Sequence, residues 1–309
     1  MNEMSFQGVD FGTRAVPLGL DHVGLAIANL QSAESAFQRL GFRLSPISMH
    51  AGATTPGGPV VPWGSGNRCA MFKQGYLELL GLVDRALPSN VKGMLDLYEG
   101  LHIVALDCAD AMRAHPALVR AGVVANAPVE LERDATFGLH DESVRRAMFR
   151  NVYLDPKVHP EARFIVIEHV TRDVLWQEHL LDHPNGAQSL EAVYLVVPDS
   201  ASSAKRLQPL LGAHHIVDRA YRFDLEHGAV WILDEQTMRS VCPVLGVSPA
   251  QRVAAACIAV RSLAALRDYL DDRDVPFSTA RTWGEDAPCL WVGPAHASHT
   301  AIQFTQSTS

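Results

Sequence analysis

The stretch LDHVGLAIANLQSAESAFQRLG, residues 20–41, decides the fold of this chain. Its first half alternates apolar and other side chains as a β-strand does. Ala33, Phe37 and Leu40 then recur at helical spacing, and Gly41 ends the helix. Three strand-like segments follow, at residues 41–50, 67–73 and 76–83. The sequence therefore predicts a unit of one strand, one helix and three further strands.

The same unit recurs three more times along the chain, which predicts an α+β fold of four βαβββ modules. The later units open with the strand-like runs GLHIVALDC (100–108), LEAVYLVVP (190–198) and VAAACIAV (253–260). Residues 171–188 form a short helical stretch that closes with a Pro-Asn-Gly turn. We expect this stretch to separate an N-terminal domain, residues 1–175, from a C-terminal domain, residues 185–309.

Composition narrows the classes of function. The chain has 309 residues, of which 48% are hydrophobic and 19% are charged, so it is long enough for a large core. Its net charge of −8 comes without a basic stripe, which argues against a nucleic-acid partner or an anionic membrane surface. Five cysteines without a CxxC pair and the lack of a long apolar run favour a cytoplasmic protein that acts on a small molecule.

Histidines occupy the opening strand in the first two units only. Aligning the four opening strands by their apolar alternation places His22 against His102, and Ala192 and Ala255 at the same point of the last two units. Side chains two apart in a strand share a face, so His22 shares a face with Gly24 and Ala26, which leave space around the ring. This pattern predicts a pocket in the first half alone.

The closing strands of the first two units each carry a glutamate among apolar neighbours, Glu78 in YLELLGL and Glu168 in FIVIEHV. A carboxylate buried without a partner costs several kcal/mol, so each needs a cation. Two imidazoles and two carboxylates suit Zn, Fe(II), Mn, Ni or Co. We therefore predict one divalent metal ion bound by His22, Glu78, His102 and Glu168.

Four further residues are candidates for contacts with the substrate. Asn67 and Arg68 follow a Gly/Pro-rich segment, residues 57–66, that we predict to be a mobile loop over the pocket. Tyr76 shares a face with Glu78, and Trp176 lies in the segment between the two halves. The alternative interpretations are a turn residue for Asn67, a surface cation for Arg68 and packed aromatic rings for the other two. His169 points opposite to Glu168, and we expect it to pack outside the pocket.

At these residues the sequence resembles the vicinal oxygen chelate superfamily, which includes glyoxalase I, epimerases and extradiol dioxygenases. It is most similar to the glyoxalase-like domain proteins, through LDHVGLAIANL (20–30), GSGNRCAMFKQGYLELL (64–80) and WQEHLLDHPNGA (176–187). The resemblance covers nearly the whole chain. It implies modules that pair into two barrel-like domains, with the metal ligands on the first and last strands of two modules.

The resemblance also implies a function. The metal of this superfamily binds two adjacent oxygens of the substrate and stabilises developing negative charge. We expect a lyase or isomerase of the glyoxalase or epimerase type, with Glu168 as the base that moves the proton and Glu78 as the second candidate. The alternatives are an Fe(II) dioxygenase that uses two histidines and one glutamate, and a non-enzymatic protein that binds or sequesters a small molecule.

The C-terminal half has Gln303 where the resemblance would place a carboxylate, besides its two alanines. We expect it to be a degenerate duplicate that stabilises the fold, covers the site or forms a homodimer.

Overall fold

The computed structural model describes residues 15–53, 58–245, 253–283 and 286–307, and this part of the chain contains all four predicted modules. The first module comprises β1 (Gly19–Ile27), α1 (Leu30–Arg39), β2 (Ser48–Ala53), β3 (Val60–Met71) and β4 (Tyr76–Leu82). The second comprises β5 (Gly100–Asp107), α3 (Ala111–Arg120), β6 (Val129–Phe137), β7 (Ser143–Tyr153) and β8 (Arg163–His169). The α+β fold class predicted from the sequence is confirmed.

The second half repeats this arrangement. The third module comprises β9 (Ala187–Val196), α5 (Ser200–Leu211), β10 (His215–Val217), β11 (Ala220–Asp224) and β12 (Ala229–Leu233). The fourth comprises β13 (Val253–Val260), α7 (Leu263–Asp271), β14 (Phe277–Arg281), β15 (Pro288–Val292) and β16 (Ala301–Gln306). The connections hold the short helices α2 (Lys92–Leu95), α4 (Arg172–Leu175), η1 (Glu178–Leu180) and α6 (Glu235–Val241).

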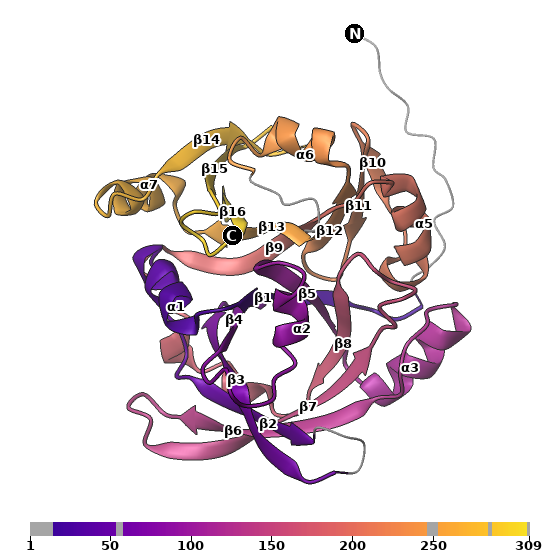
Figure 1. The fold of residues 1–309 in the computed structure, drawn as a ribbon. Coiled ribbons are helices and arrows are strands. Elements are labelled where there is room, and N and C mark those ends of the chain that lie inside the picture. Colours follow the sequence, from indigo (N-terminus) through magenta and orange to yellow (C-terminus); the bar gives the residue numbers. More distant parts are fainter. Residues whose placement is uncertain (1–14, 54–57, 246–252, 284–285, 308–309) are drawn as a thin grey trace.

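The modules pair into two eight-stranded sheets of identical topology. The first sheet has the order β2-β3-β4-β1-β5-β8-β7-β6, and the second has the order β10-β11-β12-β9-β13-β16-β15-β14. In each sheet the two opening strands run antiparallel at the centre, and each closing strand lies parallel beside its own opening strand. Figure 1 shows the first sheet below the second, with the edge strands β2 and β6 crossing in contact, so the first sheet nearly closes.

Local sequence sets the ends of the four long helices. Each begins after a residue whose side chain accepts the backbone N–H three positions later: Asn29, Asp110, Asp199 and Ser262. Gly41 and Gly122 follow the ends of α1 and α3 with φ of 85° and 94°, in the left-handed region that glycine adopts without strain. The caps fix where each of these four helices begins, and the two glycines fix where α1 and α3 end.

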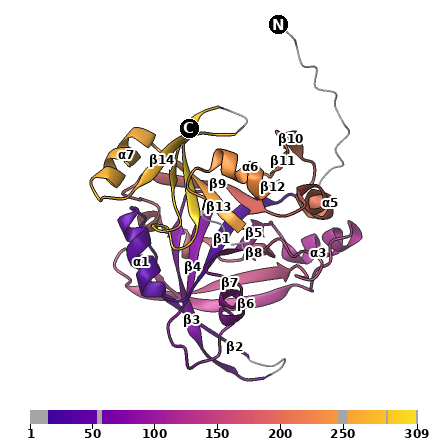
Figure 2. The same cartoon turned by 45° about the horizontal axis from the view of Figure 1, so that its top comes forward.

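The faces of the two sheets that carry the helices share one hydrophobic core. Phe42 from the first half stacks on Phe304 from the second, with 6.2 Å between ring centroids. The helices also lie side by side in pairs, α1 with α7 and α3 with α5, in the views of both Figures 1 and 2. Arg39 of α1 donates to the carbonyl of Arg273, which follows α7, and Arg206 of α5 donates to Glu161, which lies between β7 and β8.

One segment differs from its predicted structure. The glycine- and proline-rich residues expected to form a mobile loop belong mainly to strand β3, apart from residue 57, which lies outside the described residues. Glycine is required here because the strand passes close to a turn: a Cβ on Gly64 would lie 1.8 Å from the carbonyl oxygen of Asp84. The backbone of Gly64 bonds to Pro88, Val83 and Asp84 instead, so the segment is fixed.

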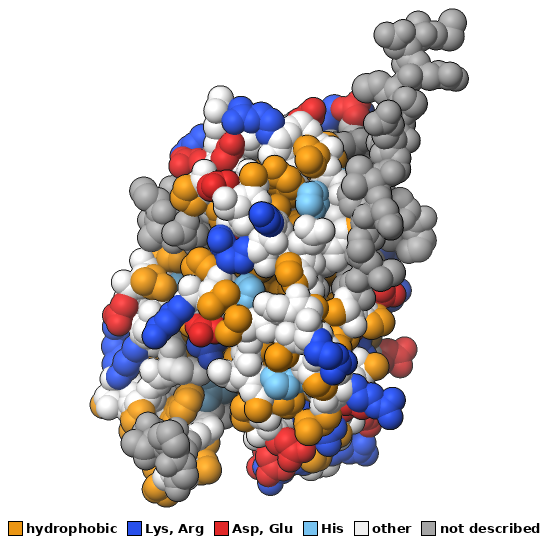
Figure 3. Space-filling view, turned by 90° about the vertical axis from the view of Figure 1, so that its right-hand side faces the viewer, with side chains coloured by type: hydrophobic (Ala, Val, Ile, Leu, Met, Phe, Trp, Pro, Cys, Tyr) orange, Lys and Arg blue, Asp and Glu red, His pale blue; other side chains and the backbone are white. Residues whose placement is uncertain are grey.

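On the face that Figure 3 presents, acidic and basic side chains of the described residues are interspersed. No helix in the described part of the chain combines the length and the apolar character needed to span a membrane.

Candidate functional site

His22 and Glu78 come together on the face of the first sheet that points away from α1 and α3, which we call the first cup. Strands β1 and β4 run parallel, with His22 opposite Tyr76 and Gly24 opposite Glu78. Nε2 of His22 lies 4.0 Å from Oε2 of Glu78. A Cβ on Gly24 would stand 3.1 Å from that oxygen and 2.9 Å from Cδ1 of Ile103, so glycine makes the room that the carboxylate occupies.

Asp21 holds the His22 ring from behind. Neighbouring residues of a regular strand point to opposite faces. Asp21 and His22 nevertheless meet, because the register of β1 is irregular between Leu20 and His22. The Asp21 carboxylate lies 2.6 Å from Nδ1 of His22 and 3.0 Å from Nε2 of His169. Burial alone would raise the pKa of Asp21, but the charges and hydrogen bonds of His169 and His22 hold it well below its usual value.

This arrangement selects the His22 tautomer. Because an ionised carboxylate only accepts hydrogen bonds, His22 donates to Asp21 through Nδ1–H. In its neutral form the ring then presents the lone pair of Nε2 to Glu78. The amide of Asn67 donates to the other oxygen of Glu78, Oε1. Two acceptors, Nε2 and Oε2, thus face one another across a 4.0 Å gap.

His102 is not part of this site. His22 pairs with Ala105 across the antiparallel strands, and His102 lies three residues further along β5, roughly 10 Å away at the usual rise per residue. Its Nε2 bonds to the carbonyl oxygen of Tyr98 at 2.9 Å, and its ring stacks on Tyr98 with 3.8 Å between centroids. Burial lowers the pKa of His102, which keeps the ring neutral in this packed position.

Glu168 faces the helices rather than the first cup. Phe164 and Val166, which share its face of β8, belong to the core under the helices. Oε2 of Glu168 accepts the N–H of Ala111, the first residue of α3, at 2.9 Å, and Oε1 accepts from Arg150 at 2.9 Å. An acidic group at a helix N-terminus is a stabilising arrangement, and here it explains how the carboxylate is satisfied without a metal.

His169 has the orientation opposite to the one predicted. We expected it outside the pocket, but it shares the face of Ile165 and Ile167 and points into the first cup. There it bonds to Asp21, and its ring lies edge-on to Trp176 at 4.9 Å.

The register of the two modules explains why the predicted set does not assemble. Helices α1 and α3 have equal lengths, so their matched ends align Asn29 with Asp110. Counted from these ends, the counterpart of His102 is Asp21. The alignment by apolar alternation was therefore wrong by one residue.

The closing strands were also misaligned, by three residues. Leu80 and Ile167 occupy corresponding positions beside the opening strands, so the residues that follow them, Gly81 and Glu168, are counterparts. A Cβ on Gly81 would lie 2.7 Å from Cβ of Leu30, the first residue of α1, which confirms that this position faces a helix. In the described part of the chain, no group of three or more His, Cys, Asp or Glu side chains is placed to hold a metal ion.

Three of the four predicted substrate contacts lie around the first cup. Asn67 bonds to Glu78, and Tyr76 stacks on His22 with 4.3 Å between ring centroids. Trp176 packs edge-on against Tyr76 at 5.6 Å and donates to the carbonyl of Phe72. Burial raises the pKa of Tyr76 well above its usual value, so it remains a phenol.

Arg68 points elsewhere. It forms an ion pair with Glu34 of α1 at 3.0 Å and donates to the carbonyl of Ser45. The structure therefore does not bring Arg68 to the first cup; the alternative interpretation, a surface cation, is nearer to its pairing with α1.

The segment that joins the two halves is held by buried polar side chains. His183 accepts the N–H of Arg43 and bonds to the carbonyl of Met71, and Asn185 donates to the carbonyl of Leu40. Both are buried. These two residues of WQEHLLDHPNGA therefore anchor the segment to the first module, whereas Trp176 contributes to the first cup.

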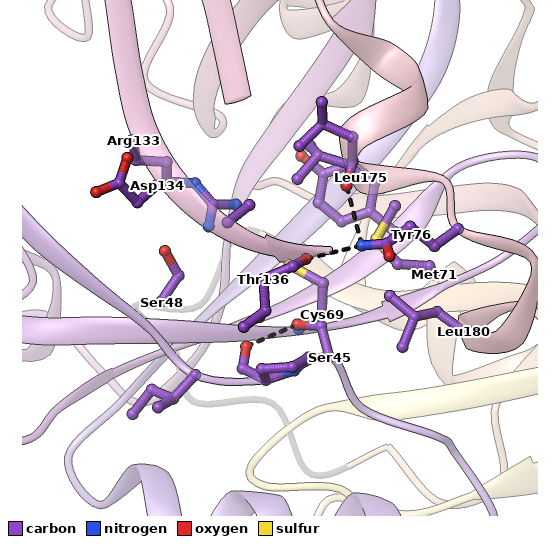
Figure 4. A pocket seen from close by; sticks show the side chains of 15 residues that line it. Ser45, Ser48, Cys69, Met71, Tyr76, Arg133, Asp134, Thr136, Leu175 and Leu180 are labelled. Carbon is purple, nitrogen blue, oxygen red and sulfur yellow. Dashed lines mark hydrogen bonds between the residues drawn. The ribbon is translucent and has the colours of Figure 1, made fainter. Parts of the chain in front are cut away.

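A small pocket of about 50 Å³ opens next to Cys69 and Tyr76, whose strand partners are Glu78 and His22, although neither of these two lines it. Its floor is formed by Cys69, which pairs with Glu78 across β3 and β4, and by Tyr76. Arg133 of β6 points into the pocket from the opposite side, as Figure 4 shows. Burial raises the pKa of Cys69 to about 12, so this thiol is not a nucleophile at neutral pH.

The equivalent face of the second sheet is filled with side chains. Tyr194 donates to Gln303 at 2.6 Å, and Trp231 stacks on Trp283 with 5.3 Å between centroids. Ala192 and Ala255 are buried in the same cluster. The residues that distinguish this half in sequence thus belong to a packed core.

Comparison with known proteins agrees with this architecture. A family model described as "Glyoxalase-like domain" matches residues 20–211. A search of the curated proteins returns no match.

Three solved structures are similar along most of the chain. A hypothetical protein from Staphylococcus aureus has 13% identity and a TM-score of 0.59, over 94% of this chain and 100% of that one. A mutant of 4-hydroxymandelate synthase from Streptomyces coelicolor has 13% identity and a TM-score of 0.57, over 95% and 94%. A fusion of a xylose isomerase-like TIM barrel with 4-hydroxyphenylpyruvate dioxygenase has 11% identity and a TM-score of 0.55, over 97% of this chain and 50% of that chain.

At these identities the likeness shows the fold alone, which is that of paired βαβββ modules. The family model covers more than half of the chain and includes both strands that carry His22 and Glu78. The chain belongs to the glyoxalase-like domain family of the vicinal oxygen chelate superfamily.

Proposed function

We propose that this chain is an enzyme of the lyase or isomerase type that moves a proton next to an oxygen-bearing carbon of a small substrate. The observation that carries the proposal is the 4.0 Å gap between two acceptors, Nε2 of His22 and Oε2 of Glu78. Two lone pairs that face each other in a buried place need a proton or a cation between them. The site is thus suited to taking up positive charge, which is what a base does.

The same pair would hold a divalent metal ion. Neutral imidazole nitrogen and carboxylate oxygen are ligands of Zn, Fe(II), Mn, Ni and Co, and Asp21 supports His22 as carboxylates support metal-binding histidines. A bound metal would supply Lewis-acid stabilisation of negative charge on two adjacent substrate oxygens. The chain provides two donors here, and substrate and water would complete the coordination.

The residues of the chain have distinct roles in this proposal. Glu78 takes the proton, because its Oε2 is the oxygen left free by Asn67. Asn67 holds Glu78 in place through Oε1, and Asp21 keeps the His22 ring oriented toward it. Tyr76 and Trp176 cover this end of the first cup and exclude water, which strengthens the electrostatic interactions inside.

The Fe(II) dioxygenase alternative requires two histidines and one carboxylate around one ion. The second histidine of the sequence prediction, His102, lies roughly 10 Å along β5 from the partner of His22. The geometry therefore favours proton transfer over ring cleavage as the reaction to test first.

Metal binding tests the proposed centre. We expect isothermal titration of the purified chain with Zn²⁺, Mn²⁺, Ni²⁺ or Fe²⁺ to show one site per chain, weakened at least a hundredfold by His22→Gln and by Glu78→Gln. The matched variants His102→Gln and Glu168→Gln should bind as the wild type does. Equal losses in all four variants, or no binding by the wild type, would overturn the metal centre.

Proton transfer is tested separately by NMR. We expect the wild type to exchange carbon-bound hydrogen for deuterium in D₂O on small α-hydroxy ketones or 2-oxo acids. Glu78→Gln should lower the rate at least a hundredfold, within the range typical of a general base. A wild type that binds these compounds without exchanging their hydrogen would instead indicate the non-enzymatic binding role.

A further inference from the structure

We propose that Arg133 binds the carboxylate of a small monoanionic substrate and so sets the substrate class of the first cup. This inference rests on the proposed function, which places the reacting end of the substrate at His22 and Glu78. It adds the residue that binds the opposite end of the substrate. The argument depends on the surroundings of the Arg133 guanidinium.

Arg133 is half-buried on β6 and points away from the acidic residues next to it in the chain. Glu132 and Asp134, on the other face of the strand, both pair with Arg146 of β7. The Arg133 guanidinium contacts the ring face of Phe149, with 5.7 Å to the centroid. Within the described residues it has no carboxylate partner, and a half-buried guanidinium without one is suited to binding an anion.

The guanidinium faces the floor of the reaction site across the pocket. Figure 4 shows Arg133 extending between the strands toward the side where Cys69 and Tyr76 lie. Tyr76 stacks on His22, and Cys69 pairs with Glu78. Arg133 and Glu78 also act in opposite directions on the pKa of Cys69, of Tyr76 and of His50, so both charges lie near the same three groups.

The charges around the pocket favour a single negative charge on the ligand. Glu78 lies at the reacting end, and Asp21 lies behind His22. One guanidinium offsets one negative charge, and a dianion would meet these carboxylates at short range in a poorly solvated space. A planar carboxylate also matches the fork of the guanidinium in a bidentate contact. The structure therefore assigns a monocarboxylate, with its oxygen-bearing carbon toward Glu78, rather than a phosphate.

Calorimetric titration with matched anionic and neutral probes tests this assignment. The probes are lactate, 2-hydroxybutyrate and 2-hydroxyhexanoate, each beside its neutral amide, and inorganic phosphate. We expect at least one carboxylate to bind the wild type at least tenfold more tightly than its amide and than phosphate. Arg133→Met should weaken that carboxylate at least tenfold and leave the amide unchanged, and Arg146→Met, on the neighbouring strand, should bind as the wild type does.

Several results would overturn the inference: no binding of any carboxylate, equal binding of acid and amide, tighter binding of phosphate, or equal losses in Arg133→Met and Arg146→Met. Circular dichroism melting of both variants shows whether each is folded. Failure of the proposed function is distinguishable, because Glu78→Gln should lose deuterium exchange but keep Arg133-dependent binding of the carboxylate. Exchange on a neutral hydroxy ketone without any binding of carboxylates would leave the proposed function standing and remove the inference alone.

Discussion

The Asp21 carboxylate accepts a hydrogen bond of 2.6 Å from Nδ1 of His22, its neighbour in sequence. Successive residues of a regular strand point to opposite faces, so this contact depends on the irregularity of β1 between Leu20 and His22. The bond fixes which nitrogen of His22 is free. The local backbone thus determines the chemistry that the ring presents to Glu78.

Asp21→Asn should weaken metal binding roughly 10- to 100-fold, as loss of a carboxylate behind a metal-binding histidine typically does. The asparagine side chain can donate as well as accept, so the His22 tautomer is no longer enforced. Isothermal titration with Zn²⁺ measures the effect. Asp107→Asn, on the neighbouring strand β5, is the matched control, because Asp107 bonds to the N–H of Gly19 outside the site. Equal affinities of wild type and Asp21→Asn would refute the role given to Asp21.

The lowered pKa of Asp21 also predicts how stability depends on pH. The pKa of Asp21 is lower in the folded chain than in the unfolded chain, where it is about 3.9. The ionised carboxylate therefore stabilises the folded state above about pH 4, and this contribution is lost as the pH falls toward the folded pKa. Urea denaturation measures the difference in unfolding free energy between the wild type and Asp21→Asn. This difference should be constant from about pH 5 to about pH 7 and should become smaller below about pH 4. A difference that stays constant down to pH 3 would contradict the assignment.

Gly24→Ala should displace the Glu78 carboxylate from its present position. Metal affinity should fall about tenfold, as is typical when the orientation of a metal ligand is disturbed. The new methyl group would stand 3.1 Å from Oε2 of Glu78 and 2.9 Å from Cδ1 of Ile103, so one of them must move. Gly93→Ala is the control, because a Cβ on Gly93 meets nothing within 4 Å. Titration of both variants with Zn²⁺ makes the comparison, and unchanged affinity in Gly24→Ala would show that the space beside the carboxylate is not needed.

Glu168→Gln should lower the free energy of unfolding by about 1 to 2 kcal/mol, because it removes an acidic group from the N-terminus of α3 and from Arg150. Metal affinity should not change. Glu132→Gln is the control on an exposed pair, where the expected loss is below about 0.5 kcal/mol. Urea denaturation and Zn²⁺ titration separate the two effects, and a loss of metal binding in Glu168→Gln would restore it as a ligand.

The order of modules could be predicted from the sequence because apolar alternation and helical spacing repeat four times. The site could be predicted only in part, because alternation fixes which face a residue takes in a regular strand but not in an irregular one. His22 and Glu78 follow the regular pattern. Asp21 and His102 lie at register irregularities of β1 and β5, so alternation misplaced His102 and gave no indication of Asp21.

Better signals for the register were present in the chain. The caps Asn29 and Asp110 and the terminal glycines Gly41 and Gly122 match one another directly, and they align His102 with Asp21. Arg133 offered no such signal, because it stands in a strand with Glu130, Glu132 and Asp134 and resembles an exposed edge. Only the pairing of those neighbours with Arg146 and Arg150 shows that Arg133 is the member that faces inward.

The junction between the halves gives a last prediction, at Glu161 and Arg206. Glu161 lies between β7 and β8 and is 1% exposed, and its Oε1 accepts from Nε of Arg206 on α5 at 2.8 Å. Oε2 has no hydrogen-bond partner among the described residues. Arg206→Met therefore leaves a buried carboxylate uncompensated and should cost about 3 kcal/mol of unfolding free energy.

The double variant Glu161→Gln/Arg206→Met should recover part of that loss, because it removes the buried charge together with its partner. Urea denaturation of the two single variants and the double variant gives the coupling energy of the pair. If the losses of unfolding free energy in the two single variants add up to that of the double variant, the two side chains act independently. The Arg206 guanidinium would then not link α5 to the first half. The shape of the Arg206→Met unfolding curve gives a second result. If this variant no longer unfolds in a single two-state step, the two halves unfold as one unit only while the ion pair is intact.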